Sequence, residues 1–357
     1  MAVLLPTSPL EAQTGYLTPD GKGDITFKPG LRLQPRYTYD NADANNDFFI
    51  ARTRIKAAGE AFQMATYYAE IKLDNVGRFA RVVNAEVENA WLNFPLHPDL
   101  ALRVGLYDAV FSRNALTSDS KLLLMDRSLI KDALTALGLA DNTVGLLGHG
   151  RPFKGRFEYS VGMFDNLQFE QASAPTAKQA DGTMQMARVG VHLLDPATPG
   201  GWADYRSSYV GQGRRLSIAA NAAYLSKAHE GVDEFDITAW GADVFFNAGP
   251  FTLESEFDDF NEDVDVVTVG GKPDANGTGW YVQGGYLVRR PVELAVRYQE
   301  RDADAGAFAN RLQWTSVGLN FYIRDHNLKV QTDYTFKREQ ANESVNDLFQ
   351  VQLQLDY

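Results

Sequence analysis

The last eleven residues, Asp347–Tyr357, constrain the fold more than any other stretch, because apolar and polar side chains alternate from Phe349 to the last residue. One parity holds Phe349, Val351, Leu353, Leu355 and Tyr357, and the other holds Gln350, Gln352, Gln354 and Asp356. Successive side chains of a strand point to opposite faces, so this segment is predicted to be a strand with one apolar and one hydrophilic face. A soluble sandwich offers such strands too, but a wholly apolar outer face that ends a chain is typical of the closing strand of an outer-membrane barrel.

The same alternation recurs along the chain and predicts sixteen strands in all. Besides the closing strand, they are Ile25–Tyr39, Phe48–Glu60, Gln63–Asp74, Asn84–Pro95, Leu100–Val110, Asn142–Gly150, Lys154–Asp165, Met184–Leu194, Arg214–Ser226, Phe235–Asn247, Phe251–Asn261, Thr278–Val288, Val292–Arg301, Arg311–Ile323 and Leu328–Arg338. Aromatic residues predicted to face outward gather toward the strand ends, as in the interfacial girdles of membrane barrels. They are Tyr37, Phe49, Phe94, Tyr224, Phe246, Trp280, Tyr298, Phe336 and Tyr357.

The connections between the predicted strands alternate between long and short. The long ones are 40–47, 75–83, 111–141, 166–183, 227–234, 262–277, 302–310 and 339–346. The short ones include 97–99, 248–250, 289–291 and 325–327, and the connection 195–213 departs from the pattern as an irregular periplasmic segment. An even number of strands with long loops at one end and short turns at the other is how outer-membrane barrels are built. We therefore expect an all-β protein: a 16-stranded antiparallel transmembrane β-barrel over residues 24–357, with a loose periplasmic lead-in at residues 1–23.

Composition excludes several other classes of protein. No apolar run approaches the roughly 18 residues of a transmembrane helix, and a net charge of −12 argues against a nucleic-acid-binding protein. Catalytic sequence motifs are absent and the five histidines are scattered, so we expect no enzyme, cofactor or metal site. The acidic stretch Asp258–Asp265 could bind calcium, but a solvated acidic surface is the simpler interpretation.

Charged residues predicted to face inward divide between two walls. The first two strands carry a basic wall of Lys28, Arg32, Arg36, Arg52, Arg54 and Lys56. Since neighbouring strands lie about 4.8 Å apart, these cations form a dense patch, and guanidinium groups bind phosphate or carboxylate in bidentate geometry. An acidic wall of Asp243, Glu254, Glu256 and Asp258 follows on later strands. The two walls either create a transverse field across the lumen, or pair with each other or with loop cations.

The longest connection, 111–141, interrupts the strand pattern for about thirty residues. Its segment Leu129–Leu137 has a helical pattern, and Leu122–Met125 is apolar. A connection of this length in a compact protein is usually functional or disordered. The apolar residues favour an ordered segment that packs inside the molecule.

Several stretches together resemble one family. They are GLYDAVFS (105–112), MDRSLI (125–130), NTVGLLG (142–148), YSVGMFDN (159–166), SVGLNFYIRDHNLKVQTDY (316–334) and QVQLQLDY (350–357). In this order and spacing they resemble the phosphate-selective porin O/P family. The resemblance implies a bacterial outer-membrane channel, usually a homotrimer, in which the third long loop folds into the lumen and inward arginines and lysines guide anions.

The resemblance also suggests which residues form the constriction. The loop in the matching place brings Arg113, Lys121, Arg127 and Lys131 toward the lumen, and Arg103 on the preceding strand joins the pore-lining cations. Where family members have Lys and Pro after the fifth strand, this chain has Asp108 and Val110. Asp119, Asp126 and Asp132 accompany the loop cations, so the local charge is near neutral and phosphate is expected to bind weakly.

The expected function is passive diffusion of small hydrophilic solutes, with a preference for anions such as phosphate. The expected partners are outer-membrane lipid, small ions and solutes, and further copies of the chain. A general or weakly cation-selective porin is an alternative within the same class. A structural protein that anchors the outer membrane is an alternative from another class.

Overall fold

The computed structural model describes most of the region predicted to form the barrel. The described residues are 25–41, 45–78, 81, 83–165, 179–180, 183–197, 204–230, 233–264, 275–303, 311–339 and 346–357. The predicted lead-in at residues 1–23 lies outside them, so it stays a prediction.

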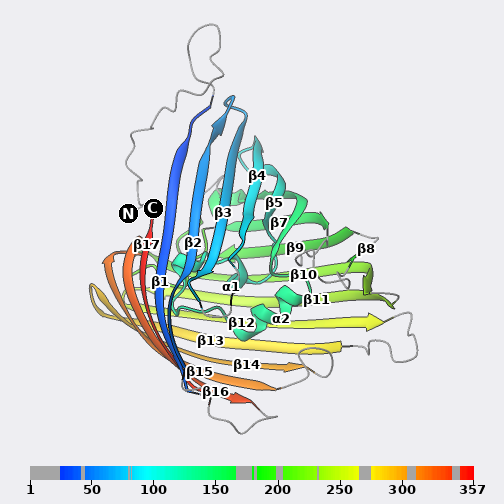
Figure 1. Ribbon diagram of the computed structural model, residues 1–357. Coiled ribbons are helices and arrows are strands. Elements are labelled where there is room, and N and C mark those ends of the chain that lie inside the picture. Colours follow the sequence, from blue (N-terminus) through cyan, green and yellow to red (C-terminus); the bar gives the residue numbers. More distant parts are fainter. Residues whose placement is uncertain are drawn as a thin grey trace.

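Seventeen strands form a single sheet in which neighbours pair antiparallel, and β1 pairs with both β2 and β17. The sheet therefore closes on itself, with β17 (red) beside β1 (blue) in Figure 1. The two-residue strand β8 prolongs β9 along their common neighbour β10, which leaves a closed barrel of sixteen strands, as predicted. The strands are β1 Lys28–Asp40, β2 Asn45–Ala61, β3 Ala65–Val76, β4 Ala85–His97, β5 Leu100–Asp108, β6 Asn142–Gly150, β7 Phe157–Asp165, β8 Gln179–Ala180, β9 Thr183–His192, β10 Arg214–Glu230, β11 Asp233–Ala248, β12 Phe251–Val264, β13 Ala275–Arg289, β14 Val292–Ala303, β15 Leu312–Arg324, β16 Leu328–Glu339 and β17 Leu348–Asp356.

Two of the connections predicted to be long are wrong in length. Strand β2 begins at Asn45, which leaves residues 41–44 between β1 and β2. Strands β10 and β11 reach Glu230 and Asp233, which leaves residues 231–232 between them. Polar residues at a strand tip resemble loop residues in composition, yet the backbone ladder continues through them because it needs no apolar side chain.

Burial separates the two faces of the barrel. On β17, Gln350, Gln352 and Gln354 are buried, whereas Leu353 is 45% exposed. The other strands repeat this division, since buried polar side chains alternate with exposed apolar ones. A polar interior and an apolar exterior are the arrangement of a barrel surrounded by lipid. None of the described helices is long and apolar enough to cross a membrane.

The predicted outward direction of Phe49 is wrong. Its side chain is 3% exposed, whereas that of Phe48 is 72% exposed. The register between β1 and β2 shifts from the pair Gln34–Arg52 to the pair Pro35–Ile50, so that Ala51 is an extra residue on β2. An extra residue in a period-two strand exchanges the two faces beyond it, which turns Phe49 inward. The other eight residues of the predicted girdle are half-buried or exposed.

The segment 109–141 contains the helices α1 (Arg113–Leu116), η1 (Asp119–Lys121) and α2 (Leu129–Ala136). The helix expected at Leu129–Leu137 is thus confirmed. Apolar side chains of the segment, among them Phe111, Ile130 and Leu134, form one buried cluster with inward residues of β6–β13. Apolar residues on an inner face are unusual for a water-filled barrel and are explained by this packing. The fourth short helix, α3 (Pro152–Gly155), lies where a turn into the seventh strand was expected, so β7 begins at Phe157.

The connection between β9 and β10 also turns inward at the short-turn end of the barrel. In its described stretch 204–213, which follows the described residues 193–197, Ser207, Ser208 and Val210 are at most 2% exposed. The Ser208 hydroxyl donates a hydrogen bond of 2.8 Å to Glu293, and Arg290 donates one of 2.9 Å to the Val210 carbonyl. The irregular segment predicted here is therefore packed against the inner ends of later strands.

Candidate functional site

Inward polar side chains of distant strands hold the middle of segment 109–141. The Asn320 amide on β15 donates to the Leu123 carbonyl at 2.8 Å, and Arg297 on β14 donates to the Asp126 carbonyl at 2.9 Å. Asp333 on β16 accepts from the Met125 N–H at 3.0 Å. The segment leaves from β5 and returns to β6, so these hydrogen bonds tie it to the inner face on another side of the barrel.

The predicted acidic wall lies under helix α1. Glu256 accepts hydrogen bonds from the N–H groups of Arg113 and Asn114, at 2.8 and 2.9 Å. The Arg113 guanidinium lies 3.5 Å from Glu254 and 4.0 Å from Asp243. These acids and Asp258 are at most 2% exposed. The acidic wall was expected either to contribute to a transverse field or to pair with cations. At Arg113 it pairs with a loop cation.

Two cavities lie between segment 109–141 and the wall formed by the first strands. The long-loop cavity, about 540 Å³, reaches Asp141, Trp314 and Lys337 near the end of the barrel that carries the long connections. The short-turn cavity, about 250 Å³, reaches Arg103, Tyr68 and Asp204 toward the other end. Five side chains line both cavities and are called the waist here: Arg54, Glu88, Asp108, Asp119 and Arg127.

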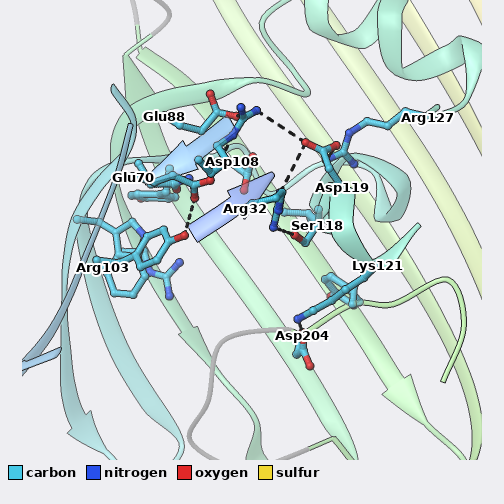
Figure 2. A pocket seen from close by; sticks show the side chains of 17 residues that line it. Arg32, Glu70, Glu88, Arg103, Asp108, Ser118, Asp119, Lys121, Arg127 and Asp204 are labelled. Atoms are coloured by element: carbon cyan, nitrogen blue, oxygen red, sulfur yellow. Dashed lines mark hydrogen bonds and ion pairs between the residues drawn. The ribbon is translucent and has the colours of Figure 1, made fainter. Parts of the chain in front are cut away.

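Asp119 is the centre of charge at the waist. Its Oδ1 lies 2.9 Å from Arg127, and its Oδ2 lies 3.2 Å from Arg52 and 3.9 Å from both Arg32 and Arg54. Burial would raise the pKa of this carboxyl, but the four guanidinium charges outweigh burial and hold the pKa well below the ordinary 3.8. Figure 2 shows the carboxylate between Arg32 and Arg127.

The residues predicted for the basic wall divide into two groups. Arg32, Arg52 and Arg54 converge on Asp119 and line the cavities. Three others line neither cavity. Arg36 binds Asp126 at 2.8 Å, Lys56 pairs with Asp356, and Lys28 is exposed at the start of β1.

The residues predicted for the constriction also separate. Asp108 and Arg127 lie at the waist, whereas Lys131 lines only one of the two cavities, the long-loop cavity. Lys121 lines the short-turn cavity and pairs with Asp204, as Figure 2 shows. Arg113 is buried against the acidic wall and lines neither cavity.

Arg103 and its aromatic neighbours line the short-turn cavity. The Arg103 guanidinium lies 4.0 Å from the Trp91 ring centre and 5.6 Å from that of Tyr107. Stacking against the rings compensates a buried cation in part. Trp91, Tyr107 and Tyr205 were not predicted as lining residues. Strand parity could have indicated Trp91, but no periodicity places Tyr205, which lies in the irregular connection.

The charges that line the cavities nearly cancel. The short-turn cavity has five basic side chains (Arg32, Arg54, Arg103, Lys121, Arg127) and five acidic ones (Glu70, Glu88, Asp108, Asp119, Asp204). The long-loop cavity has six basic side chains (Arg52, Arg54, Lys72, Arg127, Lys131, Lys337) and seven acidic ones (Asp74, Glu88, Asp108, Asp119, Asp126, Asp132, Asp141). Selectivity therefore depends on how these charges are arranged along the path, not on their sum.

The fold is that of the outer-membrane porins. An anion-selective porin from Comamonas acidovorans superposes with a TM-score of 0.63 at 10% identity, covering 93% of this chain and all of the other. OmpT, an outer membrane protein of Vibrio cholerae in its trimer form, superposes with a TM-score of 0.56 at 9% identity, covering 94% of this chain and all of the other. An uncharacterized protein of Aquifex aeolicus (strain VF5) is 24% identical over an alignment of 368 positions, which covers 92% of this chain and 86% of that protein.

The family follows from the sequence itself. The model of the family described as phosphate-selective porin O and P matches residues 27–357. The chain belongs to this family, which places the protein in the bacterial outer membrane as a porin. Family and fold indicate a channel rather than an enzyme.

Proposed function

We propose that the protein is a passive diffusion channel for small hydrophilic solutes and that it prefers anions. The observation that carries the preference is the convergence of Arg32, Arg52 and Arg54 with Arg127 where the two cavities meet. A rigid wall holds these like charges together, and an entering anion relieves their repulsion. The name of the family and that of the Comamonas porin agree with this preference.

Segment 109–141 folds into the lumen and constricts the path in this proposal. Its hydrogen bonds to inward side chains of β14–β16 and its apolar cluster with β6–β13 support that position. In this proposal solutes pass from one cavity to the other at the waist, whose five residues line both cavities. A channel that discriminates by charge needs such a narrow region, since water and salt screen charges in a wide one.

Phosphate passes this waist without being held tightly. The five acids of the short-turn cavity offset its five bases, and Asp108 lies at the waist itself. A tight anion site requires converging cations with little negative charge nearby. Half-block of chloride conductance is therefore expected well above micromolar phosphate.

A general or weakly cation-selective pore is the second candidate. The specific observation in its favour is the excess of one acid among the charged residues of the long-loop cavity. In that case the arginines at the waist would serve only to hold Asp119 and the segment in place.

Recordings from planar bilayers decide among these functions. The purified full-length protein is inserted, and the reversal potential is measured under a tenfold gradient of potassium chloride. A potential with the sign of chloride selectivity is the expected result, and the sign of potassium selectivity would favour the second candidate. A structural anchor protein would produce no unitary conductance steps.

A further inference from the structure

The four arginines around Asp119 have the composition of an anion-binding site. They come from β1, β2 and segment 109–141, and we call Arg32, Arg52, Arg54 and Arg127 the arginine cage. The side chain of Asp119 inside it is 12% exposed. Guanidinium groups donate paired hydrogen bonds that match the two oxygens of a carboxylate or phosphate. The cage thus holds a carboxylate that belongs to the chain itself.

Asp119 is not equally important to the four arginines. Among the described residues, it is the one carboxylate within 4.0 Å of Arg52 and of Arg127. Arg32 has a second partner in Asp356 at 3.2 Å. Arg54 also lies near three further acids: Glu70, Asp74 and Glu88. Without Asp119, two guanidiniums would face the waist without a carboxylate, and the other two would remain partly neutralised.

The cage lies beside both cavities of the proposed path. Asp119 and Arg127 line both cavities, Arg52 lines the long-loop cavity, and Arg32 lines the short-turn cavity. The carboxylate is fixed on the short helix η1, and Arg32 donates to the flanking hydroxyls of Ser118 and Ser120 at 2.7 and 3.1 Å. A solute anion can therefore reach the same guanidiniums that Asp119 occupies.

We propose that the arginine cage is a subsite for a compact oxyanion and that Asp119 occupies it as a tethered counter-anion. A permeating phosphate, sulfate or small carboxylate competes with Asp119 for Arg52 and Arg127. This competition lowers the affinity of the site and speeds release, so anions are favoured at the waist without blocking it. The inference rests on the proposed anion channel. It adds the arginine cage as the place where an anion binds and Asp119 as the group that competes with that anion.

The test replaces the tethered anion. Asp119→Asn keeps the size of the side chain and removes its charge. In bilayers at low salt, the concentration of inorganic phosphate that halves the chloride conductance is expected to fall at least about tenfold. The matched variant is Asp108→Asn, which makes the same substitution at the waist, where Asp108 forms none of the ion pairs found among the described residues. A fall below about threefold is expected there, because Asp108 occupies none of the guanidiniums of the cage.

Additional variants separate a filled site from a general charge effect. Asp119→Asn combined with Arg127→Gln should lose most of the gain in phosphate block, because one of the two freed guanidiniums is removed. Acetate in place of phosphate tests whether a carboxylate competes in the same way. Equal shifts for Asp119→Asn and Asp108→Asn, or no shift for Asp119→Asn, would overturn the proposal.

Folding is checked by the heat-dependent mobility of the barrel on gels. Should Asp119→Asn fail to form a barrel, Arg127→Gln alone provides the test, since a cage with three guanidiniums should need more phosphate for half-block. An unchanged value in that variant would contradict the proposal. The reversal potential of the unmodified channel is measured independently of these variants. Cation selectivity of the unmodified channel would contradict the proposed function. The phosphate block of the variants would still show whether Asp119 competes with phosphate for the arginine cage.

Discussion

At the scale of single residues, the inner face of β1 and β2 makes each arginine different. Arg54 is 3% exposed and lies near four carboxylates, so it stabilises the wall as well as the waist. Arg52 is 17% exposed and, among the described residues, has Asp119 as its one carboxylate partner. Arg52 is therefore the wall arginine whose charge is most available to a passing ion.

Reversal of this charge should shift selectivity. Arg52→Glu is expected to lower the ratio of anion to cation permeability by roughly fivefold at 0.1 M salt, which corresponds to about 1 kcal/mol for a partly exposed charge. The effect should shrink at 1 M salt, where the screening length falls to about 3 Å. Reversal potentials at the two salt concentrations measure both effects.

Lys28→Glu is the matched control for that experiment. It makes the same change of charge on the neighbouring strand, but Lys28 is exposed at the start of β1 and lines neither cavity. An equal shift in both variants would mean that the net charge of the protein sets selectivity and that the position of Arg52 beside the long-loop cavity does not.

At the scale of elements, segment 109–141 is fastened by two loop carboxylates. Asp119 lies in the arginine cage and Asp126 binds Arg36 at 2.8 Å and Gln350 at 2.6 Å. For Asp126, as for Asp119, burial alone would raise the pKa, but arginine charges outweigh it and lower the pKa below the ordinary 3.8. A carboxyl with a lowered pKa in the folded state stabilises that state above its ordinary pKa and loses the contribution as the pH falls through the lowered value.

The position of the segment should therefore be insensitive to mild acid. Hydrogen exchange of the backbone amides of residues 112–130 is expected to keep its protection from pH 7 to pH 5, after correction for the intrinsic exchange rate. Protection should fall only below about pH 3.8, as these carboxyls become protonated. Loss of protection between pH 7 and pH 5 would contradict this expectation, because both carboxyls stay ionised in that range.

Segments from the two ends of the barrel contact each other. Ser207 in the connection between β9 and β10 donates its N–H to the Lys121 carbonyl at 3.1 Å, and Arg113 donates to the Arg206 carbonyl at 3.3 Å. The connection at 204–213 thus supports segment 109–141 from the short-turn end. The sequence did not predict this contact, because the connection between β9 and β10 lies at the short-turn end of the barrel, whereas segment 109–141 starts from the long-loop end.

At the scale of the whole molecule, the closed sheet leaves an apolar outer surface that only lipid or further protein can cover. Exposed residues such as Leu294, Val296 and Leu319 extend along neighbouring strands. In a closed barrel no strand edge remains for pairing, so association has to use these side faces.

We expect three copies to associate in the membrane. The trimer form of the Vibrio cholerae OmpT, which shares this fold, motivates the expectation. Native mass spectrometry from detergent should give a protein mass three times 39.6 kDa. A protein mass equal to a single chain, at the detergent conditions that keep the barrel folded, would contradict it.

The alternation of Gln350, Gln352 and Gln354 with apolar neighbours predicted one strand with an apolar face, and the recurrence of this alternation along the chain predicted the barrel and its sixteen strands. Side-chain direction in a strand depends on the local backbone alone, so a period of two appears directly in the sequence. The same reasoning placed Arg32, Arg52 and Arg54 on the inner face.

Only the tertiary structure determined the contacts between distant parts of the chain, because no periodic pattern in the sequence links those parts. The bulge that turns Phe49 inward depends on how β1 and β2 pair, and the burial of 204–213 depends on the space left by segment 109–141. Asp119 appears in the sequence as one of several loop acids. Its role becomes apparent only when β1, β2 and segment 109–141 bring four arginines around it. An ion pair forms between groups a few ångströms apart in space, whatever their separation along the chain, so the sequence does not reveal it.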